Sequence, residues 1–313
     1  MKIVFMGTPD FSSNILEALI NNNYDIVGVV TKADKPVGRK KEIIFNPVKK
    51  VALANNIKIL QPVNIKEEYQ DILDLNPDLI ITCAYGQIVS KEVLDFPKYG
   101  CINIHASLLP KYRGGAPIHY AIINGEKETG VTIMKMVTKM DAGDIITQKS
   151  LKILETDTTE TLFDKLSELG KDLILKTIDP YINNEIISKP QDESLVTYAF
   201  NIKKEDEFIN FNRDIKEVYN HIRGLISWPV GYGIIEDIKI KFHKVSYKLA
   251  NNTKPGLVYG IENGFLKIGT IDGYILVEKL QVAGKQVVLA DAFYNGYKSK
   301  VEGKIFHEHN KNS

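Results

Sequence analysis

The first hundred residues alternate between two hydrophobic patterns. Short, nearly continuous apolar runs are typical of strands buried on both faces of a parallel sheet. Such runs occupy residues 2–6, 25–31, 78–82 and 101–105. Between them, apolar side chains recur at spacings of three and four, as in amphipathic helices, over residues 11–22 and 47–56. The alternation predicts an α/β domain, a mostly parallel sheet covered by helices.

The strand pattern continues beyond this region and is then replaced by a helical one. Residues 130–137 and 144–153 are strand-like and are joined by a turn at residues 139–143. A long amphipathic segment follows from about residue 158 to residue 183. We therefore expect two neighbouring strands and then one long helix.

A second domain is predicted after a break in this periodicity. Residues 189–205 are rich in charge, contain Pro190 and lack sustained periodicity, as interdomain linkers do. Beyond a helix near residues 213–223, short apolar runs separated by glycines are typical of a small antiparallel barrel. We expect a first domain at residues 1–188 and a second at residues 206–313.

The composition excludes several classes of protein. With 44% hydrophobic and 25% charged residues over 313 positions, the chain is neither disordered nor fibrous. The opening residues lack a signal-peptide pattern, and no apolar run approaches the ~18 residues that cross a bilayer. We expect a cytoplasmic monomer with no membrane partner. Cys83 and Cys101 are too few for a disulfide framework or a structural zinc site, and we expect buried thiols.

Charge is balanced overall but unevenly distributed. The chain has 40 Lys and Arg residues against 39 Asp and Glu residues. Residues 31–50 carry seven basic and two acidic side chains, and residues 238–313 carry twelve lysines, no arginine and six acidic side chains. These two basic zones are either solvated surface or faces that contact an anionic partner such as a nucleic acid.

Missing motifs disfavour several common chemistries. The turn at residues 6–10 follows a strand and opens a helix, but it lacks the three glycines of a dinucleotide-binding fingerprint. No G-x-S-x-G elbow is present, and His105 and His119 lack the spacing of metal ligands. We therefore expect no nicotinamide cofactor, no serine hydrolase and no metal centre.

Residues 101–118 favour a specific chemistry. Asn103 and His105 are two apart on a predicted strand, so both side chains leave one face near the strand's carboxyl end, where open α/β sheets place their sites. The loop that follows is rich in proline, glycine and cations, a composition suited to holding a ligand through backbone groups. Asp141, in the predicted turn, is a candidate partner for the histidine, although a purely structural His105 stays open on the sequence alone.

Three ordered motifs resemble the signature of the 10-formyltetrahydrofolate-dependent formyltransferases. They are Asn103-Ile104-His105, the run SLLPKYRG from Ser107 to Gly114, and Asp141-Ala142-Gly143-Asp144-Ile145. Further similarity is found at residues 6–9, 34–39, 227–229 and 280–285. The resemblance therefore covers nearly the whole chain, and it is strongest to the members of the family that act on initiator methionyl-tRNA.

The resemblance implies a Rossmann-like formyl-transfer domain followed by a small β-barrel of the oligonucleotide-binding type. It implies transfer of a formyl group from 10-formyltetrahydrofolate to the methionine α-amino group of initiator methionyl-tRNA. Asn103, His105 and Asp141 fall on catalytic positions. Folate-binding positions fall on Tyr85, Gly86, Gln87, Ile88, Ser107, Leu108, Leu109 and Pro110. Within the basic segment, tRNA-binding positions fall on Arg39, Lys40 and Lys41.

These residue types suit direct attack by an amine on a formyl carbon. The Asn103 amide can stabilise the oxygen on which negative charge develops, and His105 can move protons between the two nitrogens. Asp141 can orient the imidazole and favour its charged form. The chemistry needs no metal.

Three alternatives share part of this pattern. A formyltransferase for an amino-sugar nucleotide and a formyl-folate hydrolase can use the same three residues, but neither needs the basic segment at residues 31–50. A non-catalytic tRNA-binding protein needs the second domain but not the catalytic residue set. In that domain we expect Trp228 and Tyr232 to pack in the core, with stacking on RNA as the alternative.

Overall fold

The computed structural model describes residues 1–37 and 42–308 and divides into two compact units. The first unit comprises Met1–Pro117, Glu128–Lys152 and Phe163–Phe200. The second unit comprises Ile118–Lys127, Ile153–Leu162 and Asn201–Ser313. Two short segments that precede residue 163 are therefore part of the second unit.

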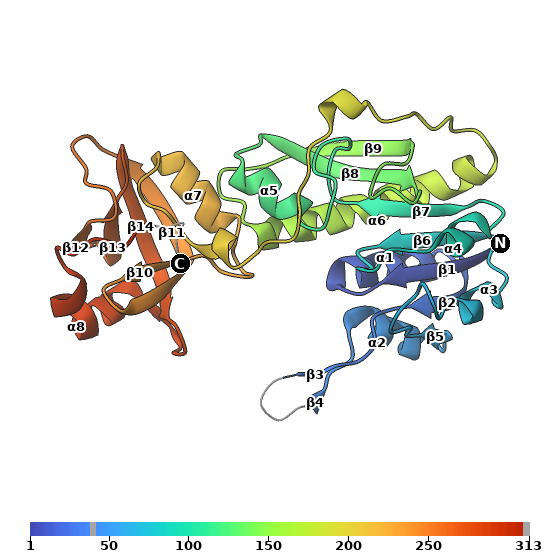
Figure 1. Cartoon of the computed structure of the whole chain (residues 1–313), viewed down its shortest axis with the longest axis horizontal. Coiled ribbons are helices and arrows are strands. Elements are labelled where there is room, and N and C mark those ends of the chain that lie inside the picture. Colours follow the sequence, from blue (N-terminus) through green and yellow to red (C-terminus); the bar gives the residue numbers. More distant parts are fainter. Residues whose placement is uncertain (38–41, 309–313) are drawn as a thin grey trace. The chain divides into compact units, whose positions relative to one another are not determined.

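Among the described residues of the first unit, seven strands form one sheet (Figure 1). The strands are β1 (Lys2–Gly7), β2 (Asp25–Val30), β5 (Ile59–Leu60), β6 (Leu79–Cys83), β7 (Cys101–His105), β8 (Glu128–Lys135) and β9 (Ile145–Lys152). Their order is β5-β2-β1-β6-β7-β8-β9. The first five run parallel, whereas β8 and β9 are antiparallel to their neighbours. The predicted mostly parallel, Rossmann-like sheet is confirmed.

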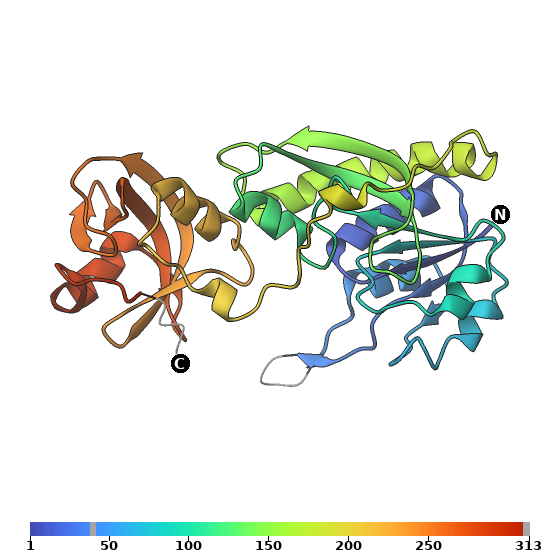
Figure 2. The same ribbon diagram turned by 45° about the horizontal axis from the view of Figure 1, so that its top comes forward.

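Helices cover both faces of this sheet (Figures 1 and 2). On one face lie α1 (Asp10–Asn21) and α6 (Thr159–Ile182), where the rings of Phe11 and Phe163 meet edge to face at 5.4 Å. On the other lie α3 (Gln70–Leu73) and α4 (Lys91–Asp95), whose apolar side chains share a buried cluster with Val4 and Met6 of β1. Burial on both faces explains why the strands are continuous apolar runs.

The basic segment at residues 31–50 contains a small hairpin of β3 (Pro36–Val37) and β4 (Glu42–Ile43). The helix α2 (Pro47–Ala54) follows; the side-chain oxygen of Asn46 caps it by accepting from the Lys49 N–H at 3.0 Å. The Lys49 ammonium pairs with Asp34, so part of the positive charge counted in this zone is neutralised. The predicted tRNA-binding residues Arg39, Lys40 and Lys41 lie outside the described residues.

An antiparallel sheet forms the framework of the second unit. Its strands are β10 (Tyr232–Ile235), β11 (Ile238–Leu249), β12 (Val258–Glu262), β13 (Phe265–Gly269), β14 (Gly273–Val282) and β15 (Val287–Leu289). The order is β10-β11-β14-β13-β12, and β15 pairs with β14. The apolar face of α7 (Ile215–Arg223) packs on this sheet in one buried cluster. The prediction of a separate antiparallel β domain is confirmed.

One expectation for the second unit is wrong, and one of its helices is not predicted from the sequence. Ala290–Val301, for which the sequence pattern makes no prediction, forms the helix α8. Gly296 and the closely spaced aromatic residues obscure the helical period, although Phe293 and Tyr294 are buried. Trp228, expected in the core, is 69% exposed because it lies in the loop before β10; its carbonyl accepts from His119 Nε2 at 3.1 Å.

Two further observations bear on function. Both Cys83 and Cys101 are free and buried, as expected. Of the helices in the described ranges, including the short α5 (Pro117–Ile123), none is long and apolar enough to span a bilayer.

Candidate active site

The carboxyl ends of the neighbouring strands β6 and β7 bring Thr82 and Asn103 together. These residues are paired in the sheet, and the Thr82 hydroxyl donates to Asn103 Oδ1 at 2.8 Å. Because Oδ1 accepts this bond, Nδ2 carries the donor hydrogens of the half-buried amide. Asn103 Nδ2 donates no hydrogen bond to any of the described residues. The side chain is thus an oriented donor with capacity for a ligand oxygen.

His105, at the end of β7, has a hydrogen bond at one ring nitrogen and a carboxylate near the other. The side chain is 6% exposed, and Nε2 lies 2.9 Å from the Tyr112 carbonyl oxygen. A carbonyl only accepts, so the hydrogen-bond network assigns a proton to Nε2. Nδ1 lies 3.7 Å from Asp141 Oδ2, too far for a direct hydrogen bond but within range of a charged pair. The nitrogen free to gain and lose a proton is therefore Nδ1, beside the carboxylate.

Asp141 lies in the turn between β8 and β9 in the left-handed region, with φ +48°. Its Oδ2 accepts from the Gly114 N–H at 2.8 Å, which links the turn to the loop after β7. Gly114 also has positive φ, and a Cβ there would lie 2.5 Å from the Ala199 carbonyl oxygen. At Gly143 a Cβ would lie 1.9 Å from the Lys135 carbonyl oxygen. Two glycines of the sequence motifs are thus required by close backbone approach.

The loop from Ser107 to Pro110 is held by side chains of β8 and β9. The buried Ser107 hydroxyl donates to the Lys111 carbonyl at 2.7 Å. Thr132 donates to the Ser107 carbonyl at 2.6 Å and accepts from the Leu109 N–H at 3.1 Å. Gln148 donates to the Leu109 carbonyl at 2.9 Å. The loop therefore has a defined shape, and the Ser107 hydroxyl is used within it.

The segment Tyr85 to Ile88 follows β6 and lies at the same carboxyl edge of the sheet. Gln87 accepts from the Ile65 N–H at 3.0 Å and donates to the Pro62 carbonyl at 3.1 Å, so its amide anchors the segment. Tyr85 is buried, and burial raises the pKa of its phenol to about 12. Ile88 is 65% exposed and offers apolar surface next to the site. Gly86 has a φ of +84° that favours glycine.

Arg113 and Gln191 were not singled out as functional from the sequence. Arg113 is fully buried; its Nε and Nη2 donate to Gln191 Oε1 at 3.1 and 2.9 Å, and Nη2 pairs with Glu193 at 2.8 Å. Gln191 Nε2 in turn donates to the carbonyls of Asp141 and Gly143, each at 2.8 Å. Gln191 falls in the stretch predicted as a linker, and no local pattern there indicates these contacts.

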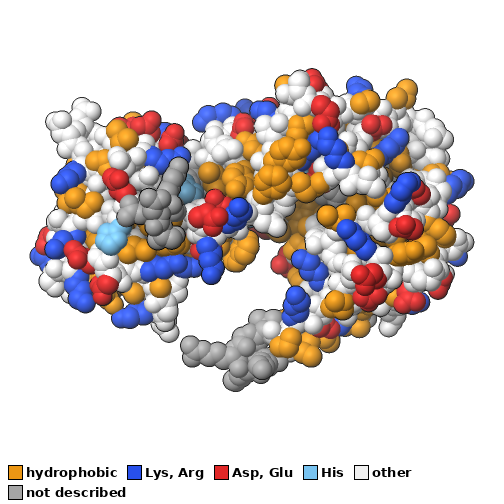
Figure 3. Space-filling view, viewed as in Figure 1, with side chains coloured by type: hydrophobic (Ala, Val, Ile, Leu, Met, Phe, Trp, Pro, Cys, Tyr) orange, Lys and Arg blue, Asp and Glu red, His pale blue; other side chains and the backbone are white. Residues whose placement is uncertain are grey.

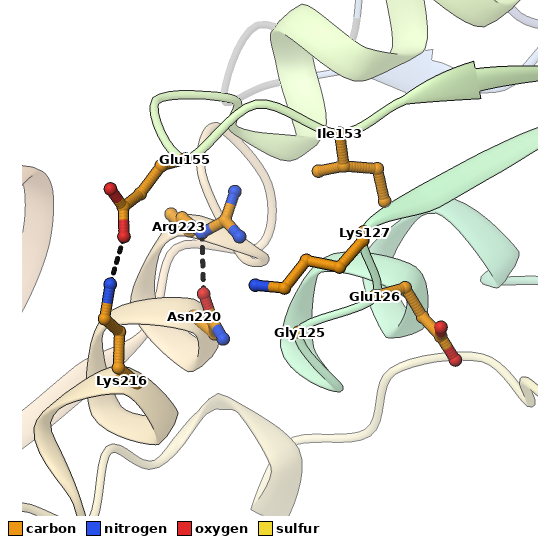
Figure 4. Close-up of a pocket in the computed structure, with 8 residues that line it drawn as sticks. All are labelled: Gly125, Glu126, Lys127, Ile153, Glu155, Lys216, Asn220 and Arg223. Atoms are coloured by element: carbon orange, nitrogen blue, oxygen red, sulfur yellow. Dashed lines mark hydrogen bonds and ion pairs between the residues drawn. The ribbon is translucent and has the colours of Figure 1, made fainter.

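A separate cavity of about 490 Å³ lies in the second unit (Figure 4). It is lined by Gly125, Glu126, Lys127, Ile153, Glu155, Lys216, Asn220 and Arg223. Lys216 pairs with Glu155, and Arg223 donates to Asn220 Oδ1 at 2.9 Å and to two main-chain carbonyls. Lys216 and Glu155 neutralise each other and Arg223 donates to neutral acceptors, whereas the predicted catalytic residues are elsewhere. Within the described ranges, no group of three or more His, Cys, Asp and Glu residues can hold a metal ion.

Family models and relatives match both halves of the chain. The formyl transferase model matches residues 1–178, and the model of the formyl transferase C-terminal domain matches residues 201–298. The methionyl-tRNA formyltransferase of Bacillus cytotoxicus is 49% identical over 309 residues, which is 97% of this chain and 98% of that protein. The methionyl-tRNA formyltransferase of Malacoplasma penetrans is 49% identical over 285 residues, 91% of this chain and 90% of that protein.

Solved structures give the same fold at lower identity. The sugar 3N-formyl transferase WlaRD, solved with dTDP and 5-N-formyl-THF, is 26% identical, with a TM-score of 0.66 over 91% of this chain and 99% of that chain. A variant of HypX from Aquifex aeolicus has a TM-score of 0.69 over 96% of this chain and 50% of that chain, at 17% identity. The first likeness spans both proteins nearly end to end, and the second concerns the fold alone.

Proposed function

The chain belongs to the formyl transferase family, among the methionyl-tRNA formyltransferases, and we propose that it transfers a formyl group from 10-formyltetrahydrofolate to the α-amino group of methionine on initiator tRNA. The observation that carries this proposal is the convergence of Asn103, His105 and Asp141 at the carboxyl edge of β7, with His105 Nδ1 3.7 Å from the carboxylate. The 49% identity to methionyl-tRNA formyltransferases, which extends over nearly the full length of the chain, supports the choice of acceptor.

The three side chains divide the work of one acyl transfer. The α-amino nitrogen attacks the formyl carbon, a carbon–nitrogen bond forms, and negative charge develops on the formyl oxygen. The Asn103 amide, oriented by Thr82, donates to that oxygen. The bond to N10 of the folate then breaks, and the products are formylmethionyl-tRNA and tetrahydrofolate.

Proton movement falls to His105. The attacking nitrogen must lose a proton and N10 must gain one, and Nδ1 is the ring atom available for both steps because Nε2 is committed to the Tyr112 carbonyl. Asp141, beside Nδ1, stabilises the imidazolium formed between the two transfers. Each proton therefore passes through one nitrogen with a neighbouring counter-charge.

Substrate binding is assigned to the flanking segments. Residues 107–110 and 85–88 border the carboxyl edge of β6 and β7 and form the folate site in this proposal, with the exposed Ile88 as apolar surface for the pterin or benzoyl ring. Arg39, Lys40 and Lys41 contact tRNA phosphates. On the second unit, Lys239 and Lys241 lie on the solvent side of β11 and are further candidates for phosphate contacts.

The test is transfer of labelled formyl from 10-formyltetrahydrofolate to initiator methionyl-tRNA. Parallel reactions offer an amino-sugar nucleotide or water alone as the acceptor, and His105→Asn serves as the catalytic variant. We expect label on the tRNA with the parent protein and a rate lowered by about 100-fold or more in the variant. Label on the sugar, or release of formate alone, would contradict the choice of acceptor; an unimpaired His105→Asn would contradict the mechanism.

A further inference from the structure

We propose that Gln191 is a positioning residue for formyl transfer: its side-chain amide holds the turn that presents the Asp141 carboxylate to His105. The reaction in which this matters rests on the proposed function, whereas the contacts themselves do not. Gln191 lies 50 residues from Asp141 in sequence, yet it donates to the Asp141 carbonyl at 2.8 Å.

The bonding partners fix the orientation of the Gln191 amide. Two guanidinium nitrogens of Arg113 donate to Oε1. The flipped amide would place the Nε2 donor against these two donors, so that orientation is excluded. Nε2 therefore points the other way and donates to the carbonyls of Asp141 and Gly143. All four bonds are between 2.8 and 3.1 Å. Gln191 thus links the buried Arg113 guanidinium to the turn that carries Asp141.

Asp141 needs such support because of its backbone. At φ +48° it lies in the left-handed region, which is uncommon for a residue with a Cβ although Asp adopts it more often than most, so contacts that hold the turn stabilise this conformation. The direction of the side chain follows from that backbone, so a change in φ and ψ would swing the carboxylate away from His105 Nδ1. Gln191 bonds the carbonyl of Asp141 and that of Gly143 two residues on, and so fixes the turn on both sides of Ala142.

Gln191 is itself held by main-chain bonds on both flanks. On one side, Ile145 and Lys189 exchange two backbone hydrogen bonds of 2.8 Å. On the other, Arg113 N–H donates to the Thr197 carbonyl at 2.9 Å, and Ala199 N–H donates to the Arg113 carbonyl at 2.8 Å. We call residues 189–199 the strap.

The strap controls both sides of the imidazole. The Tyr112 N–H donates to Thr197 Oγ1 of the strap at 2.9 Å, and the carbonyl of the same Tyr112 receives the bond from His105 Nε2. Through Gln191 the strap also sets Asp141, which faces Nδ1. Loss of the Gln191 contacts should therefore affect the proton-transfer step and leave the folate and tRNA surfaces in place.

The discriminating variant is Gln191→Glu. A carboxylate still accepts both Arg113 bonds, so the link between the strap and Arg113 survives, but it cannot donate to the two carbonyls of the turn. Gln191→Met, which has similar length and removes both sets of bonds, is the second variant in case the added charge prevents folding. Ser194→Ala is the matched control, because it removes a strap hydrogen bond that reaches only Asp192.

Two measurements test the proposal. First, kcat and KM for both substrates are determined per folded molecule; we expect kcat to fall about 10- to 100-fold in either Gln191 variant, with each KM within about twofold. Second, the backbone amide resonance of Gly114, whose N–H bonds Asp141 Oδ2, is followed by NMR without substrate. It should move in the Gln191 variants in the direction it moves in Asp141→Ala, and stay in place in Ser194→Ala.

The outcomes separate this proposal from the proposed function. A kcat within twofold of the parent in Gln191→Glu, or an unmoved Gly114 resonance, overturns the positioning role. The positioning role is also overturned if the variant loses thermal stability and its loss of kcat disappears at low temperature, where the variant is fully folded. That outcome would indicate a structural role only. If the parent protein fails to formylate methionyl-tRNA, the proposed function falls, and the Gly114 resonance still decides the role of Gln191.

Discussion

The site around β7 and the strand β11 use polar residues in opposite ways. At the site, Asn103, His105 and Asp141 are half-buried or buried, and each has a defined hydrogen-bond partner. Along β11, the side chains of Ile238, Ile240 and Phe242 are buried, and the lysines between them are half-buried on the opposite face. On the face drawn in Figure 3, the basic side chains of this unit lie among acidic ones.

The difference follows from what each region has to do. Stabilising a developing charge requires a donor placed within tenths of an ångström, and buried hydrogen bonds supply that placement at the cost of desolvation. Attracting a phosphate backbone requires only positive charge within a Debye length, which lysines at the surface provide. Single substitutions should therefore be severe at the site and graded on β11.

The largest effect is expected for Asn103→Ala. Without the oriented amide, the formyl oxygen loses its donor in the transition state, and we expect kcat to fall by about 10²–10³ with KM little changed. Steady-state kinetics with initiator methionyl-tRNA measure this. Asn22→Ala, which removes a part-buried helix-end bond to the Ala18 carbonyl far from β7 in the sequence, is the control and should retain its activity. A loss below about fivefold in Asn103→Ala would mean that the oxyanion is stabilised elsewhere.

A graded effect is expected for the double variant Lys239→Gln and Lys241→Gln. Lys239 Nζ lies 3.3 Å from the centroid of the Tyr232 ring, and Lys241 donates to the Pro229 carbonyl at 3.1 Å, so the fold holds both ammonium groups on one face. Each lost phosphate contact should lower the slope of log K against log salt for tRNA binding by about 1. The kcat at saturating tRNA should not change.

Lys300→Gln tests whether the position of the charge matters. It removes one positive charge, against two in the double variant, from α8 of the same unit, where the side chain is exposed. Salt titrations of tRNA binding should give the parent slope for this control. Identical slopes for the double variant and the parent would exclude β11 from the phosphate contacts.

The sequence predicts features that depend on neighbouring residues and misses those that depend on distant ones. The period of two places Asn103 and His105 on one face of β7, and the turn residues indicate where Asp141 lies. Gln191 bonds Asp141 and Arg113, which are 50 and 78 positions away in the sequence, and no local pattern indicates such contacts. Thr132 and Gln148 support the folate loop in the same way, from strands that the sequence predicts only as strands.

Two other misses have different physical causes. The helix α8 contains Gly296 and clustered aromatic residues, so burial against the sheet overrides a weak local preference. The Trp228 side chain is large and mostly apolar, but its position in the loop before β10 leaves it exposed. The main-chain carbonyl of Trp228 accepts a hydrogen bond from His119. Both cases show that packing context, rather than residue type, decided the outcome.

The smallest effect is expected at the outer edge of the strap. Arg113 and Lys139 both pair with Glu193 and lower the pKa of its carboxyl from 4.5 to about 2. Because the pKa is lower in the folded state, the stabilisation is fully present above about pH 4.5 and is lost as the pH falls toward about 2. Glu193 is 58% exposed, so solvent screening keeps this contribution small.

Chemical unfolding of the parent and Glu193→Gln across this range checks the expectation. The two midpoints should differ most above pH 5 and converge as the pH approaches 2, since protonation then removes the same charge from the parent. Glu185→Gln, which changes another exposed carboxyl of the first unit, is the control for the general effect of charge. A difference that stays constant with pH would show that the charge of the Glu193 carboxyl, and so its ion pairs with Arg113 and Lys139, does not stabilise the fold.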